Sequence, residues 1–166
     1  MRVLLIRHGQ AVDPDRAPSD ALRWLTPRGR TTMRGVTGAL EELGLRWTHA
    51  FTSPLPRAVQ TAEIMASPPW FEGEVAIVPA LAPDDGTTAQ SLAPLEGLPD
   101  DAFAVLVGHE PKIRVLAGHL LGFDTFPAFR TGGACLVRWT PGAAAGFELA
   151  MDPDDRRPIR DVGALR

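Results

Sequence analysis

Apolar runs alternate along this chain with segments of helical periodicity, and this alternation constrains the fold more than any other feature. Six apolar runs indicate strands, at Arg2–Arg7, Thr48–Thr52, Val75–Pro79, Phe103–Gly108, Ala134–Trp139 and Phe147–Met151. The first and fourth are continuously apolar at their centres, as expected of parallel strands that are buried on both faces. We therefore predict an α/β domain with three layers, α/β/α, around a mixed, mostly parallel six-stranded sheet.

Three helices are predicted between these strands. Their apolar positions recur at helical spacing: Met33, Val36, Leu40 and Leu43; then Val59, Ala62, Ile64 and Met65; then Ile113, Leu116, Ala117 and Leu120. Gly44 and Gly122 follow the first and third helices as stops, and Ser53 is the predicted N-cap of the second. The stretch 80–101 is rich in Pro, Asp and Gly, so we expect a surface segment that forms one rim of a site.

Size and composition are typical of a small globular domain. The 166 residues are 45% hydrophobic and carry a formal net charge of −3, so we expect a single domain over residues 1–166 and no nucleic-acid partner. The one cysteine, Cys135, excludes an internal disulfide and is expected in the core. No run has the length of a signal peptide or a membrane span, so we expect a cytoplasmic protein without a membrane partner. The sequence does not set the oligomeric state.

Three of the predicted strands end in short polar turns. These turns contain Arg7-His8-Gly9, Ser53-Pro54-x-x-Arg57-Ala58-x-Gln60-Thr61-Ala62 and Gly108-His109-Glu110. The carboxyl ends of parallel strands meet at one edge of a sheet, where ligands of open α/β folds bind. We therefore expect Arg7, His8, Arg57 and His109 to converge at that edge.

The residue types at this edge suit a phosphoryl group. Arginine guanidinium groups match phosphate oxygens in geometry and stay charged at any working pH. Gly9 allows the main chain to approach a ligand closely. A histidine nitrogen can attack phosphorus and form a covalent phosphohistidine, while fixed cations stabilise the transition state. The motifs therefore predict phosphoryl chemistry with His8 as the nucleophile.

Taken together and in this order, the motifs resemble the histidine phosphatase superfamily, which has the phosphoglycerate-mutase-like fold. The resemblance extends over nearly the whole chain. Within the superfamily, the SixA-type phosphohistidine phosphatases are similar in their short length and in the motif Asp20-x-x-Arg23-x-Leu25-Thr26-x-x-Gly29. The resemblance implies that His8 becomes phosphorylated and that Arg7, Arg57 and His109 complete the phosphate pocket. It also implies that the protein needs neither a metal nor an organic cofactor.

One expected residue is missing. Phosphomutases and many phosphomonoesterases of this superfamily have a glutamate after the third strand, which protonates the leaving oxygen. Here that region reads Pro79-Ala80-Leu81-Ala82-Pro83-Asp84-Asp85. Glu110 and Asp84 are the candidates left for a general acid. The missing glutamate disfavours a mutase and favours a phosphoramidate substrate, because imidazole leaves with little help.

The sequence therefore favours a metal-independent phosphatase that acts on phosphohistidine of a signalling protein. A small-molecule phosphomonoesterase, acting on a sugar or nucleotide phosphate, is the rival enzyme. A non-catalytic phosphate-binding module on the same fold is the rival from another class. For Arg23 two roles stay open, contact with the substrate and a salt bridge to Asp20.

Overall fold

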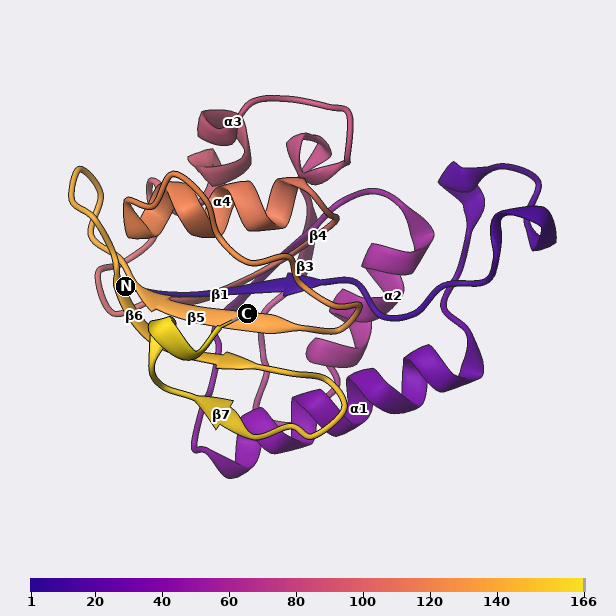
Figure 1. Ribbon diagram of the computed structural model, residues 1–166, viewed down its shortest axis with the longest axis horizontal. Coiled ribbons are helices and arrows are strands. Elements are labelled where there is room, and N and C mark those ends of the chain that lie inside the picture. The colour runs from indigo at the N-terminus through magenta and orange to yellow at the C-terminus, as the bar shows by residue number, and fades with distance from the viewer. Residues whose placement is uncertain (166) are drawn as a thin grey trace.

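A seven-stranded mixed sheet forms the centre of the protein, described here from a computed structural model over residues 1–165 (Figure 1). The strands are β1 (Arg2–Arg7), β2 (His49–Thr52), β3 (Val75–Ile77), β4 (Phe103–Gly108), β5 (Ala134–Arg138), β6 (Gly146–Met151) and β7 (Pro158–Ile159). They lie in the order β3-β2-β4-β1-β5-β6-β7. The pairings from β3 to β1 are parallel, and those from β1 to β7 are antiparallel.

The predicted three-layer α/β fold with a mixed sheet is confirmed, with one strand more than expected and with three of the six strand pairings parallel rather than most of them. The additional strand, β7, has only two residues and begins at Pro158, so it has no alternating pattern that a sequence reading can detect. The bounds of β1 and β4 agree with the prediction, because their apolar runs are long and uninterrupted.

Helices cover both faces of the sheet and give the three predicted layers (Figure 1). They are α1 (Pro27–Glu42), α2 (Pro56–Met65), α3 (Thr88–Leu92) and α4 (Lys112–Leu121). Leu4 and Ile6 of β1 pack on the side of α1 and α2, whereas Val3 and Leu5 pack on the side of α4. This alternation follows from the two-residue period of a strand, and it places a central strand between two apolar cores.

Two predicted helix ends are confirmed and one predicted helix start is not. Gly44 lies just beyond the end of α1 and Gly122 just beyond the end of α4, both in the left-handed conformation, at φ 74° and φ 71°. Thr26, which was not predicted as a cap, begins α1 by accepting a hydrogen bond from the Gly29 amide. The prediction that Ser53 caps α2 is wrong. The N-cap position belongs to Leu55, whose backbone is extended because it precedes Pro56, so α2 begins at Pro56. The Ser53 hydroxyl accepts from the Leu55 amide and lies 2.8 Å from His109 Nε2.

The segment 80–101 folds as α3 together with 3₁₀ turns, and its Pro83 borders the cleft described below. None of the helices within residues 1–165 is long and apolar enough to cross a membrane.

Candidate active site

An open cleft lies where β1, β2 and β4 end, because all three strands run in parallel toward the same edge of the sheet. The cleft has a volume of about 520 Å³. Its lining includes the four residues that we expected to converge and, beside them, Asp20, Arg23 and Glu110. The topology thus brings together side chains that lie far apart in the chain, such as Arg7 and Glu110.

His8 sits directly after β1 and is buried, with 8% of its surface exposed. Its backbone amide donates to the Gly108 carbonyl, which fixes the turn against the end of β4. Its Nδ1 lies 2.7 Å from the Gly9 carbonyl, an acceptor, so Nδ1 carries the proton and Nε2 keeps a free lone pair. Burial lowers the pKa of His8 to about 4, against the raising effect of the Gly9 hydrogen bond and with further lowering by the charges of Arg57 and Arg7.

His109 follows β4 and faces His8, with 4.8 Å between the two ring centroids. Its Nε2 lies 2.8 Å from the Ser53 hydroxyl, and only 2% of its surface is exposed. Burial, the charge that His8 would have if protonated and the charge of Arg57 together lower the pKa of His109 to about 3. Both histidines are therefore neutral near pH 7.

Three arginines bring positive charge to the cleft. Arg57, at the start of α2, donates from Nη1 to the Asp20 carbonyl over 2.6 Å and from Nη2 to the Asp20 carboxylate over 3.1 Å. Arg23 donates to the same carboxylate over 2.8 Å, and Arg7 donates to the Phe129 carbonyl over 2.6 Å. Asp20 thus joins Arg23 to Arg57, and these hydrogen bonds and charges keep the pKa of its carboxyl below the usual range.

Several buried polar atoms at the cleft have no hydrogen-bond partner within the described protein. Within the described chain, four buried side-chain nitrogen or oxygen atoms lack a hydrogen-bond partner, and three of them belong to this site: Arg7 Nε, Arg57 Nε and His109 Nδ1. Buried polar groups without partners are rare in folded proteins and mark places that a polar ligand or water completes. The cleft is therefore suited chemically to a small anion.

The other predicted site residues divide into three groups. Arg23 lines the cleft and is also paired with Asp20, so both of its proposed roles are compatible with its position. Glu110 lines the cleft, but its two carboxylate oxygens contact the Phe129 amide at 2.9 Å and Arg114 at 3.4 Å. Asp84 is exposed and does not line the cleft.

Gly9 is needed for a reason different from the one we predicted. A Cβ atom at this position would lie 2.8 Å from Met33 Cγ and 3.2 Å from the Gly29 carbonyl oxygen. The missing side chain thus makes room for α1 rather than for a ligand. The Gly9 carbonyl contributes to the site by holding His8 Nδ1.

Three residues of the second motif support the site in ways that the sequence did not predict. Thr61 accepts a hydrogen bond from the Gly9 amide over 3.1 Å and donates to the Arg57 carbonyl over 2.7 Å, which ties α2 to the end of β1. Gln60 accepts from the Leu25 amide over 2.8 Å, and Ser53 holds His109. All three belong to the motif after β2, so the motif itself was the available signal.

The chain is similar in sequence to one protein family and to several known proteins. The model of the histidine phosphatase superfamily (branch 1) matches residues 3–82, which contain β1, α1, β2 and α2. An uncharacterized protein of Picosynechococcus sp. is 40% identical over 121 residues, or 68% of each chain. The Pgam5 mitochondrial serine/threonine-protein phosphatase of Drosophila ananassae is 38% identical over 63 residues, but the matched region spans only 21% of its length.

Solved structures extend the likeness to the whole fold. The protein histidine phosphatase SixA, in complex with tungstate, superposes with a TM-score of 0.83 and 26% identity over 95% of this chain and 100% of its own. The α-ribazole phosphatase of Shigella flexneri superposes with a TM-score of 0.65 over 98% of this chain and 97% of its own. At 16% identity, the second likeness is one of fold alone.

Proposed function

The chain belongs to the histidine phosphatase superfamily and is a hydrolase of the phosphatase class, and from this premise we propose that it dephosphorylates phosphohistidine on a signalling protein. The reaction passes through a covalent intermediate on His8 and needs no metal. One observation carries the proposal: His8 Nδ1 is bound to the Gly9 carbonyl, which leaves Nε2 unprotonated beside three arginines. The cytoplasmic location expected from the sequence stays a prediction.

In the first step, the Nε2 lone pair of His8 forms a bond to phosphorus in line with the bond that breaks. That bond joins phosphorus to a nitrogen of the substrate imidazole, and its electron pair stays on that nitrogen. Since the other ring nitrogen of the substrate carries a proton, a neutral imidazole leaves. Arg7, Arg57 and Arg23 hold the phosphoryl oxygens, where fixed cations stabilise the charge that develops in the transition state.

In the second step, water attacks the phosphorus atom of phospho-His8. The bond between phosphorus and Nε2 breaks, its electrons return to Nε2, and both protons of the water leave with the phosphate. Throughout both steps the proton stays on Nδ1, which donates it in a hydrogen bond to the Gly9 carbonyl and so keeps the ring oriented for the next turnover.

His109 has the features of a neutral hydrogen-bond donor in this scheme. The Ser53 hydroxyl oxygen accepts from the Leu55 amide over 3.3 Å, so its own proton is free to point at His109 Nε2. In that arrangement the His109 proton lies on Nδ1, the buried atom without a partner. A donor to a phosphoryl oxygen is then in place without adding a charge.

The choice of a phosphorus–nitrogen bond rests on the candidates for a general acid. Glu110 accepts a hydrogen bond from the Phe129 amide with one carboxylate oxygen and contacts Arg114 with the other, so both of its oxygens are already engaged within the protein. Asp84 lies outside the cleft. A phosphate ester expels an alkoxide that needs a proton, whereas a protonated phosphoimidazole does not. The likeness to SixA supports the same substrate class.

A substrate panel tests this proposal. The purified protein is offered a phosphohistidine peptide, sugar phosphates, nucleotides and an aryl phosphate, and kcat/KM is ranked. We expect the phosphohistidine peptide to rank first. If a sugar phosphate or a nucleotide ranks first by a wide margin, the protein is a small-molecule phosphomonoesterase and our substrate assignment is wrong.

A further inference from the structure

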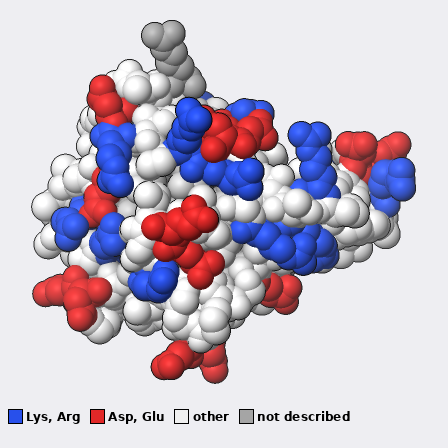
Figure 2. Space-filling view, turned by 90° about the horizontal axis from the view of Figure 1, so that it is seen from below, with Lys and Arg blue, Asp and Glu red and all other residues white. Residues whose placement is uncertain are grey.

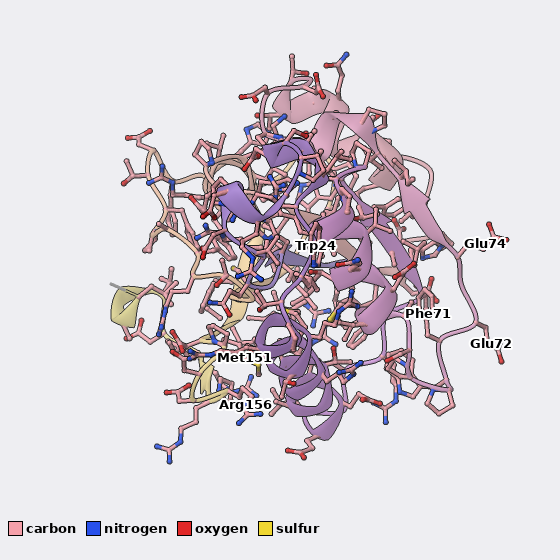
Figure 3. The ribbon with its side chains drawn as sticks, turned by 90° about the vertical axis from the view of Figure 1, so that its right-hand side faces the viewer. Trp24, Phe71, Glu72, Glu74, Met151 and Arg156 are labelled. Atoms are coloured by element: carbon pink, nitrogen blue, oxygen red, sulfur yellow. The ribbon has the colours of Figure 1, made fainter. Side chains whose placement is uncertain are left out.

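An exposed strip of the chain borders the cleft and has no role in the chemistry described above. Within residues 1–165, five large hydrophobic side chains are exposed, and two of them lie on either side of Arg23: Leu22 with 51% and Trp24 with 40% of their surface exposed. Figure 3, which looks toward this edge of the sheet, shows Trp24 near the middle of the face that contains the cleft.

This exposure is built into a fixed backbone. The Val12 amide donates to the Trp24 carbonyl over 2.9 Å, and Arg23 Nε donates to the Val12 carbonyl over 2.6 Å. Ala11 and Leu25 form an antiparallel bridge next to these bonds. Leu22 and Trp24 are therefore held on the outside while Arg23, between them, reaches into the cleft.

Positive charge continues from this strip onto α1. Figure 2 shows Lys and Arg side chains gathered over the N-terminal half of α1, which contains Arg28, Arg30 and Arg34. Arg28 is exposed and forms no ion pair with the residues that the structure describes. The first turn of α1 holds no acidic residue, although negative charge would stabilise that end of a helix. Local helix stability thus does not account for the arginines.

We infer that Leu22, Trp24 and Arg28, the docking strip, bind the segment of a partner protein that carries the phosphohistidine. The segment that fits has an apolar residue beside the phosphohistidine and carboxylates beyond it, which match Leu22 and Trp24 and then Arg28. Leu22, Trp24 and Arg28 lie outside the residues that line the cleft, so the docking strip serves a substrate that extends beyond its phosphoryl group. This inference rests on the proposed function.

The test uses three substrates that share one leaving group. The first is N-phosphoimidazole, the second a phosphohistidine peptide flanked by Leu and Glu, and the third the same peptide flanked by Ser and Gln. The variants are Trp24→Ser, Leu22→Ser and Arg28→Gln. Phe123→Ser is the matched control, since Phe123 is 43% exposed just beyond the C-terminus of α4, away from the cleft.

We expect the wild type to prefer the Leu/Glu peptide over the Ser/Gln peptide by about tenfold in kcat/KM, because one buried aromatic contact contributes on the order of that factor. Trp24→Ser should remove most of this preference through KM. Hydrolysis of N-phosphoimidazole should stay unchanged in all three variants, and Phe123→Ser should behave as wild type with every substrate.

Different failures of this test have different meanings. If the wild type does not hydrolyse N-phosphoimidazole or either peptide, the proposed function itself fails. The wild type could hydrolyse all three substrates but show equal kcat/KM for the two peptides, or Trp24→Ser could slow the hydrolysis of N-phosphoimidazole as much as that of the peptide. Either result would show that the docking strip does not bind the substrate, while the proposed function would be unaffected. If light scattering finds a wild-type dimer that Trp24→Ser converts to a monomer, the strip binds a second copy of this chain and the inference is overturned.

Discussion

At the residue scale, the environment of His8 decides what the site can do. A histidine in water is half protonated near pH 6.5 and would then be a poor nucleophile. Here burial and the neighbouring arginines lower its pKa to about 4, and the Gly9 carbonyl selects the tautomer that leaves Nε2 free. The same arginines that would hold the phosphoryl group also keep the nucleophile unprotonated.

The first prediction concerns the acid limb of the pH–rate profile. Because His8 must be neutral to attack, kcat/KM should fall as the pH drops through about 4, the pKa of His8 in the folded protein. The measurement is kcat/KM for an aryl phosphate between pH 3.5 and 8, corrected for the ionisation of the substrate. An acid limb near pH 6.5 would mean that His8 titrates like a solvated histidine.

At this scale the sequence predicted which residue types form the site, but not which of them bind to one another. Arg7, His8, Arg57 and His109 were found because each lies at the end of a recognisable strand or in the turn and helix start that come after it. The bridge from Asp20 to Arg57 spans 37 positions, and nothing in local periodicity indicates it. Trp24 has an apolar side chain next to a core residue, Leu25, so the sequence alone cannot tell its exposed position from a buried one.

At the element scale, the approach of α1 to the turn after β1 is the contact that shapes the site. Gly29 in the first turn of α1 packs against Gln10, two positions beyond His8. A Cβ atom at Gly29 would lie 2.1 Å from the Gln10 carbonyl oxygen, a backbone atom that cannot move away cheaply. This contact explains why the Thr26-x-x-Gly29 part of the sequence motif ends in glycine.

Two glycine substitutions in α1 should therefore have opposite effects. Gly29→Ala should destabilise the protein by about 1–3 kcal/mol through overpacking, and it should also lower kcat/KM because the displaced segment holds the site. Gly38→Ala, in the same helix with no atom within 4 Å of the added Cβ, should stabilise it by about 0.5–1 kcal/mol. Urea unfolding measures both values. Equal changes in the two variants would show that the contact with Gln10 is unimportant.

Element boundaries were predictable where one dominant local signal exists. The apolar runs of β1 and β4 and the left-handed Gly122 are such signals. The start of α2 was misplaced because Pro56 holds the residue before it, Leu55, in an extended conformation, so the helix begins at Pro56 and not directly after Ser53. With only two residues, β7 is too short to show the alternation of apolar and polar residues by which a strand is predicted.

At the scale of the whole molecule, the site reduces stability in mild acid. In the unfolded chain His8 and His109 have pKa values near 6.5, whereas in the folded protein these are about 4 and about 3. Between these values the unfolded state binds more protons than the folded state. The free energy of unfolding should therefore decrease as the pH falls from about 6.5 toward 4, and neither histidine should contribute a slope above pH 7.

A double variant isolates this effect. Thermal or urea unfolding of the wild type and of His8→Gln/His109→Gln at pH 7, 6 and 5 gives two curves of stability against pH. The wild type should lose stability more steeply than the double variant, whose two sites do not titrate. Parallel curves would indicate that the two histidines have ordinary pKa values in the folded protein.

Trapping the covalent intermediate tests the central claim most directly. The wild type and His8→Ala are mixed briefly with a ³²P-labelled phosphohistidine peptide, denatured in alkali, and examined for protein-bound label. We predict label on the wild type that survives base and is lost in acid, as a phosphorus–nitrogen bond requires. His8→Ala, folded by circular dichroism, should carry no label and should have lost turnover. Near-normal turnover in folded His8→Ala, or label in the wild type that resists acid, would contradict the assignment of His8 as the nucleophile.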